Sequence, residues 1–125
     1  MQIPPVSSSF YSQNDPYKEL MNTFYQDWTN WYQAASDPNS NKEQVQKLTK
    51  GLIDFLKEHK EKFIFATKNI PKPMGPGFKE SFSDLYKNTL NDLESWKRHG
   101  CKSGQASMIS ELVADVYTWC LKANA

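Results

Sequence analysis

Residues 24–32 read FYQDWTNWY, and five of these nine positions are aromatic. In both directions from Phe24, apolar side chains recur every three or four residues, which is the spacing of one face of an α-helix. An Asp-Pro pair at 15–16 is typical of a helix start, and a second Asp-Pro pair at 37–38 ends the pattern. We therefore predict a helix over about 16–35. Its apolar face comprises Tyr17, Leu20, Met21, Phe24, Tyr25, Trp28, Trp31, Tyr32 and Ala35.

Three further segments have helical spacing. Residues 40–43, SNKE, match a capping box and open a second helix whose apolar stripe continues to Ala66. Residues 69–77, NIPKPMGPG, hold three prolines and two glycines and predict a loop. A third helix is predicted over about 79–98 and a fourth over about 103–122. Apolar residues, Tyr117 and Leu121 among them, cover more than half the circumference of the fourth helix, so we expect it to be the most enclosed one. The stripe of the second helix comprises Val45, Leu48, Leu52, Phe55, Leu56, His59, Phe63 and Ala66.

The chain has 125 residues, which fits one domain that can bury a core without disulfides or metal. We find no convincing strand pattern and no internal repeat. The predicted fold class is all-α, an antiparallel four-helix bundle over 15–125 with a Pro/Gly-rich loop between the second and third helices. Residues 1–14 are rich in Ser, Gln, Asn and Pro. We predict that they form a flexible N-terminal arm.

The charge composition argues against a nucleic-acid-binding protein. The formal net charge is +1, and fourteen lysines accompany one arginine, Arg98. Arginine is the residue best suited to bidentate contacts with phosphates and bases. No apolar run approaches the roughly 20 residues of a membrane-spanning helix, so we expect no membrane insertion. The sequence starts without a basic stretch followed by an apolar one. We expect a cytoplasmic protein, with a specialised secretion route left open.

The two cysteines, Cys101 and Cys120, flank the predicted fourth helix. That helix would separate them by about 25 Å, whereas a disulfide needs Cα atoms within about 7 Å. We therefore predict free thiols, in keeping with a reducing compartment. Cys101 follows His99 by two residues near a helix start, a setting that lowers a thiol pKa. A thiol enzyme using Cys101 is one alternative function, although we favour an exposed, unreactive Cys101 and a buried Cys120.

Other catalytic and metal-binding patterns are absent from the sequence. The two histidines, His59 and His99, form no His-x-x-x-His or Glu-x-x-His pair. There is no glycine-rich phosphate loop and no Gly-x-Ser-x-Gly elbow. We therefore predict a non-enzyme with no cofactor and no metal. His59 falls in an apolar stripe, and we interpret it as a partly buried histidine rather than a pH-sensitive switch.

Three surfaces are candidates for contact with another protein. The aromatic face of the first helix is wide, and the tyrosines at its edge are of the kind favoured at interfaces. The second helix places isoleucines among lysines on a side away from its stripe. The Pro-rich loop adds exposed apolar groups at low entropic cost. The candidate partner-binding residues are Tyr25, Trp31, Tyr32, Ile53, Lys57, Lys60, Ile64, Met74 and Phe78.

These observations predict a non-catalytic protein-binding module. It would act as an adaptor, a chaperone or an inhibitor of a partner protein, including a partner enzyme. The identity of the partner stays open, and homodimerisation is compatible with this function. The alternative from another class is a carrier of a small apolar ligand or lipid, held in an aromatic pocket inside the bundle.

Overall fold

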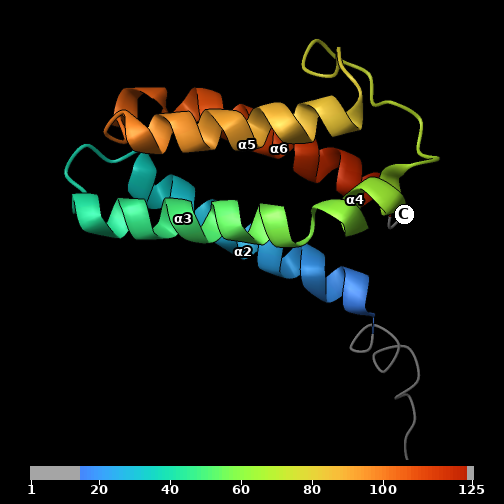
Figure 1. The fold of residues 1–125 in the computed structure, drawn as a ribbon, viewed down its shortest axis with the longest axis horizontal. Helices are drawn as coiled ribbons and strands as arrows, with labels where there is room; N and C mark the ends of the chain where they lie inside the picture. The colour runs from blue at the N-terminus through green and yellow to red at the C-terminus, as the bar shows by residue number, and fades with distance from the viewer. Residues whose placement is uncertain (1–14, 124–125) are drawn as a thin grey trace, which may run out of the picture.

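Helix α2 (Pro16–Ala35) begins the part of the chain that the computed structural model describes, residues 15–123 (Figure 1). Over that range the fold is all-α and contains no strand, which confirms the all-α part of the predicted class. The predicted arm over 1–14 lies outside the described residues. The elements after α2 are α3 (Lys42–Glu58), α4 (Lys60–Thr67), α5 (Phe82–Arg98), the 3₁₀ turn η1 (Ser103–Gln105) and α6 (Ala106–Ala123).

Side-chain caps fix where three of these helices begin. Asp15 accepts hydrogen bonds from the first backbone N–H groups of α2, the nearest at 3.0 Å, as its sequence predicts. Asn41 caps α3 by accepting from the N–H of Gln44 at 3.1 Å, so the cap lies one residue after Ser40. Ser81 caps α5. That helix therefore starts three residues later than predicted, after the proline- and glycine-containing connection.

The predicted second helix is interrupted at His59, and its prediction as one continuous helix is wrong. His59 has φ −104° and ψ 10°, outside the helical region, and it separates α3 from α4. In α4, Phe63 has no exposed surface, whereas Phe65 is 78% exposed. The His59 side chain is half-buried, with its ring 4.7 Å from that of Phe55.

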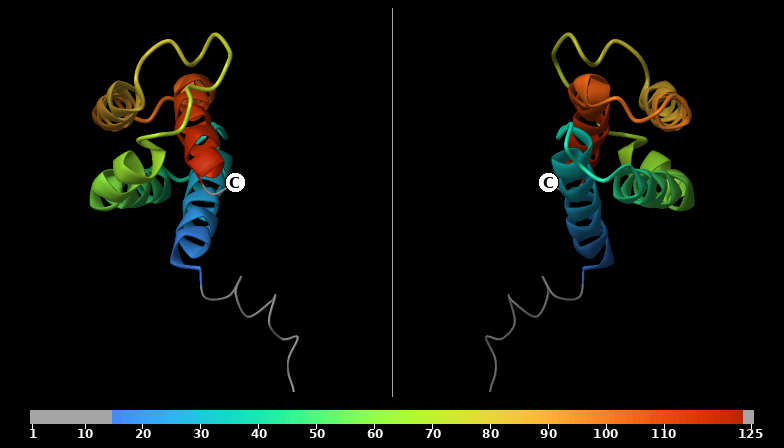
Figure 2. Two further views of the ribbon diagram at one scale, coloured as in Figure 1. Left: turned by 90° about the vertical axis from the view of Figure 1, so that its right-hand side faces the viewer. Right: turned by 90° about the vertical axis from the view of Figure 1, so that its left-hand side faces the viewer.

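The helices pack in a closed ring of neighbours. Helix α2 contacts α3 and α6, and α5 also contacts α3 and α6, so each long helix has two long neighbours. The end views in Figure 2 show α2, α3, α5 and α6 around a common centre. Figure 1 shows that consecutive long helices run in opposite directions. Short α4 extends the α3 side and packs against α5 and α6.

Buried rings and hydrogen bonds hold these helices together. The Tyr86 hydroxyl of α5 donates to the Leu56 carbonyl of α3 at 2.5 Å, and the Tyr17 hydroxyl of α2 donates to the Cys120 carbonyl of α6 at 2.7 Å. Each bond pairs a polar group that would otherwise be left unsatisfied in an apolar interior. Burial raises the pKa of both tyrosines, so the hydroxyls stay protonated donors at physiological pH.

The loop between α4 and α5 lies against an acidic position of α6. A Cβ atom added to Gly77 would clash with a carboxylate oxygen of Asp115, so the loop backbone approaches that side chain closely. Burial, and secondly the negative charge of Glu111 one turn earlier, raise the pKa of Asp115 above its ordinary value of 3.8. The ionised form of Asp115 is therefore disfavoured in the folded protein.

Asp115→Asn should stabilise the protein at neutral pH. A carboxyl with a raised folded-state pKa contributes stability below its unfolded pKa and loses it as the pH rises through the folded pKa. We expect the free energy of unfolding at pH 7 to rise by about 0.5 kcal/mol, the scale of a like-charge pair four residues apart on a helix. Urea denaturation at pH 7 and pH 3 measures the difference, which should vanish at pH 3. Asp92→Asn, an exposed carboxylate on α5, is the matched control.

Candidate protein-binding surface

Two of the predicted partner-binding residues are buried, and their assignment to a partner surface is wrong. Trp31 has no exposed surface. Its Nε1 donates to Thr49 Oγ1 of α3 at 3.0 Å, and its ring packs edge-on against Trp96 of α5 with centroids 5.5 Å apart. Ile53 is buried as well, because α5 packs against α3 in addition to α2. A further helix therefore covers the position of Ile53, which lies beside the main stripe of α3.

Five other candidates lie away from α2 and do not form one surface. Lys57 is exposed on α3, and its Nζ lies 3.0 Å from Glu94 Oε2 of α5. Two of the others are half-buried on α4, and two lie in the loop that follows, where Met74 is almost fully exposed. In chain order the five are Lys57, Lys60, Ile64, Met74 and Phe78.

The two remaining candidates are Tyr25 and Tyr32, and Tyr25 belongs to an aromatic cluster that spans α2 and α6. The ring centroid of Tyr117 lies 5.8 Å from that of Tyr25 and 5.4 Å from that of Trp28. Trp28 also donates Nε1 to Ser110 Oγ of α6 at 2.9 Å, which fixes its orientation. Trp28 and Tyr117 are half-buried, whereas Tyr25 is 50% exposed. Two helices therefore hold three rings in place along an open edge.

Helical spacing extends this cluster along both helices. Tyr32 follows Trp28 by four residues and is half-buried. Leu121 follows Tyr117 by four residues and is 43% exposed. Residues four apart lie on the same side of a helix. We define the aromatic face as Tyr25, Trp28, Tyr32, Tyr117 and Leu121.

The aromatic face carries no charge at its centre. Every residue three or four positions away from Tyr25, Trp28 or Tyr117 along its helix is uncharged. Burial, and secondly the neighbouring Tyr25, raise the pKa of Tyr117, so its hydroxyl is neutral at physiological pH. Tyrosine and tryptophan are enriched, and charged residues depleted, at the centres of protein–protein interfaces. The composition of the face is that of an interface centre.

Sequence reasoning found one side of this face and missed the other. It assigned Tyr25 and Tyr32 to a rim but left Trp28 in the apolar stripe of the first helix. It also took the helix that carries Tyr117 and Leu121 to be the most enclosed one. The sequence does contain a signal for an exposed apolar side on that helix, because apolar residues cover more than half of its circumference. Only two long helices pack against α6, so part of so wide an apolar surface remains open.

Cys101 is buried, so its prediction as an exposed cysteine is wrong. The chain leaves α5 through Gly100 at φ 95°, and Cys101 itself has φ 53°. The N–H groups of Gly100 and Cys101 return to the carbonyls of Lys97 and Trp96, the pattern of a Schellman motif. This turn points the thiol back toward the end of the helix. Cys120 is fully buried, as predicted.

The surroundings of Cys101 do not favour a thiolate. Burial raises the pKa of the thiol, although the nearby positive charges of Lys42 and Lys97 act in the opposite direction. His99 Nδ1 lies 2.7 Å from the Ser95 carbonyl on its own helix. Within the described chain no hydrogen bond joins His99 to Cys101. The structure therefore does not assemble the nucleophile and base that a thiol mechanism needs.

Among residues 15–123, no group of three or more His, Cys, Asp or Glu side chains is arranged to hold a metal ion. In the same part of the chain, no helix is both long enough and apolar enough to cross a membrane. No protein-family model, curated protein or solved structure matches the chain.

Proposed function

We propose that the protein is a non-catalytic module that binds another protein through the aromatic face. The observation that carries this proposal is the half-exposed ring of Tyr25, held against Trp28 and Tyr117 between two helices. Monomeric proteins seldom leave a contiguous apolar patch open to solvent without a use for it. Aromatic side chains in such patches are frequently the residues that dominate binding energy.

The rigidity of the face supports this function. The Trp28–Ser110 bond and the Tyr17–Cys120 bond both connect α2 to α6. A partner would therefore meet rings whose positions are already fixed, and binding would cost little side-chain entropy. The uncharged centre leaves no ion to be desolvated when water is expelled.

The other exposed candidates would have secondary roles. Lysines of α3, such as Lys57, would steer an acidic partner toward the molecule, and Met74 in the loop would add an apolar contact. In this role the protein would be a cytoplasmic antiparallel four-helix bundle that serves as an adaptor, a chaperone or an inhibitor of a partner enzyme. Self-association through the same face is the isologous form of this binding.

The test compares two double variants that each remove two exposed apolar side chains. Tyr25→Ser with Leu121→Ser changes the aromatic face. Phe65→Ser with Met108→Ser changes exposed residues of α4 and of the α5 side of α6. The tagged proteins are used to capture partners from lysate of the source cells, and the dissociation constant is then measured with the purified partner. We expect it to rise at least about tenfold for the first pair.

The second pair should bind as tightly as the wild type, and both pairs should keep its melting temperature to within a few degrees. Equal affinity of the two double variants for the captured partner would contradict the assignment of the aromatic face. Absence of any partner captured at stoichiometric amounts by the wild type would contradict the binding function itself.

A further inference from the structure

The outer side of α2 and α6, next to the seam where Tyr25 and Tyr117 meet, carries two strips of regularly spaced residues. In each strip the residues are alternately four and three positions apart, the spacing that keeps one side of a helix turned toward its neighbour in coiled coils. We define the outer strips as Lys18, Asn22, Tyr25, Thr29 and Tyr32 of α2 with Ser107, Glu111, Ala114, Thr118 and Leu121 of α6. None of these residues is buried, so both strips are open in the described chain.

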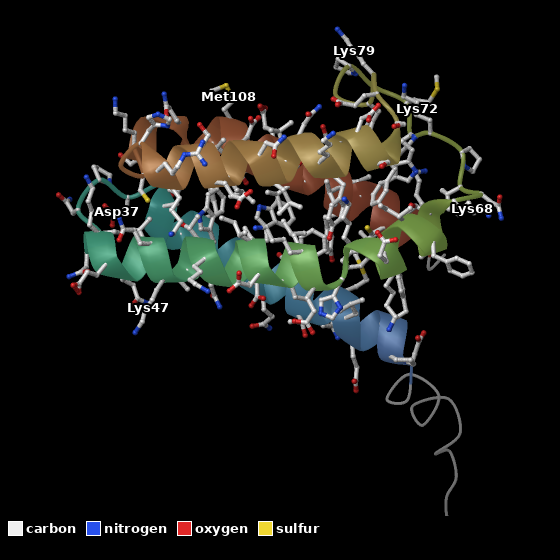
Figure 3. All side chains as sticks on the ribbon, in the orientation of Figure 1. Asp37, Lys47, Lys68, Lys72, Lys79 and Met108 are labelled. Atoms are coloured by element: carbon white, nitrogen blue, oxygen red, sulfur yellow. The ribbon has the colours of Figure 1, made fainter. Side chains whose placement is uncertain are left out.

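Charge distinguishes this side of the bundle from the opposite one. Eight of the ten residues in the outer strips are uncharged. On the opposite side, formed by α3 and α5 (Figure 2), Lys50 pairs with Asp54. Lys57 of α3 also pairs with Glu94 of α5. Figure 3 looks onto that side and shows Lys47 pointing away from the bundle. Because charged residues are depleted at interface centres, the α2–α6 side is the one suited to close contact with another surface.

The exposed charges of α6 have opposite signs. They are Glu111 and Lys122, which are eleven residues apart. Eleven residues make about three helical turns, so the two side chains lie on the same side of α6, about 17 Å apart along its axis. Asp115 lies between them in sequence, but it is half-buried against the loop at Gly77. The exposed side of α6 is therefore basic near its end and acidic nearer its beginning.

Lys18 of α2 lies at the basic end of the outer strips. The neighbouring Tyr17 donates its hydroxyl to the Cys120 carbonyl, which places the start of α2 beside the end of α6. Glu19 lies about 100° further round α2, away from α6. The Asp15 carboxylate accepts from the first backbone N–H groups of its own helix. The surface is therefore complementary in charge to a second copy of itself that is turned end to end.

We propose that the outer strips bind a second copy of this chain, with α6 of one copy antiparallel to α6 of the other. Lys122 of each copy then lies near Glu111 of the other, and the uncharged residues around Tyr25 form the centre of the contact. The reverse arrangement would bring the basic ends of the two copies together. The contact is isologous, because both copies use the same residues. This inference rests on the proposed role of the aromatic face and names its partner.

The size of the surface predicts a reversible dimer. Two helices side by side offer an area about 30 Å long and about 20 Å wide. Two such areas bury on the order of 1,200 Å² together, at the low end for specific complexes. Sedimentation velocity of the full chain from about 1 µM to about 500 µM should therefore show a monomer that converts to a dimer as the concentration rises.

Two double variants locate the contact. Tyr25→Ser with Leu121→Ser removes two side chains of the outer strips and should raise the dissociation constant of the dimer at least about tenfold. Phe65→Ser with Met108→Ser removes two exposed apolar side chains elsewhere and should leave the dissociation constant unchanged. Circular dichroism confirms that each variant is folded.

Charge reversal tests the antiparallel arrangement. Lys122→Glu places like charges together in both symmetry-related contacts, and we expect the dissociation constant to rise about fivefold. Adding Glu111→Lys to this variant restores opposite charges and should return the dissociation constant to within about twofold of the wild type. The differences should vanish in about 1 M salt, which screens exposed charges.

A chain that stays monomeric over the whole concentration range overturns the dimer. The affinity of the aromatic face for a different, captured protein is measured separately, so the proposed function can stand when the dimer fails. Equal dissociation constants for the two double variants overturn the placement of the contact. Equal values for Lys122→Glu with and without Glu111→Lys overturn the antiparallel arrangement.

Discussion

Trp31→Ala should lower the free energy of unfolding by about 4 kcal/mol, in the range of large-to-small substitutions of buried aromatic residues. The ring has no exposed surface and lies between Thr49 of α3 and Trp96 of α5. Its removal would leave a cavity at a contact of three helices, and the surrounding helices could close it only in part. Equilibrium urea denaturation followed by far-ultraviolet circular dichroism measures the loss.

Tyr25→Ala is the matched control, because it changes an aromatic residue in the same nine-residue stretch. Tyr25 is half-exposed and makes its ring contacts along the open edge of the α2–α6 seam. We expect a loss below about 1 kcal/mol, typical of surface positions with limited packing. Similar losses for the two variants would contradict the division of the rings between a buried side and the aromatic face.

The helices themselves could be predicted from the sequence because their signals are local. An aspartate before a proline and an apolar residue at every third or fourth position depend only on neighbours within a few turns. The bounds of α2 and the glycine at the end of α5 follow from such signals. The start of α3 was predicted to within one residue, since Ser40 and Asn41 are both good caps and only the folded chain selects between them.

Burial around each helix could not be predicted in the same way. Periodicity gives the centre of an apolar face, but the neighbouring helices decide how much of the rest is covered. Ile53 was assigned to the surface because it lies beside the main stripe of its helix, and α5 covers it. Tyr117 was assigned to the enclosed interior, and it is half-buried at an open seam. Both errors concern which helices become neighbours.

The candidate sites show the same limit. Tyr25 was identified from its angular position alone, whereas Tyr117, the ring that it contacts on the other helix, lies about 90 residues later in the chain. The orientation of the Cys101 thiol depends on two consecutive residues with positive φ, one of which is not glycine. Residues other than glycine rarely adopt a positive φ, so the sequence does not predict this backbone conformation at Cys101.

Phe63→Ala should lower the free energy of unfolding by about 4 kcal/mol. Phe63 has no exposed surface, and its ring packs against rings of three other helices. These rings are Tyr17 and Phe24 of α2, Phe55 of α3 and Tyr86 of α5, with centroids 5.7 to 6.2 Å away. Phe63 is the one large apolar side chain of α4 that is fully buried, so the substitution removes the main anchor of α4. Urea denaturation measures the loss.

Phe65→Ala provides a control that differs from Phe63→Ala by two positions on the same short helix. Phe65 is 78% exposed, and its removal should change the free energy of unfolding by less than about 0.5 kcal/mol. Equal losses for the two variants, or a larger loss for Phe65→Ala, would contradict the burial of Phe63 and the exposure of Phe65. A large loss for Phe63→Ala alone supports a helix whose direction is set by one buried ring.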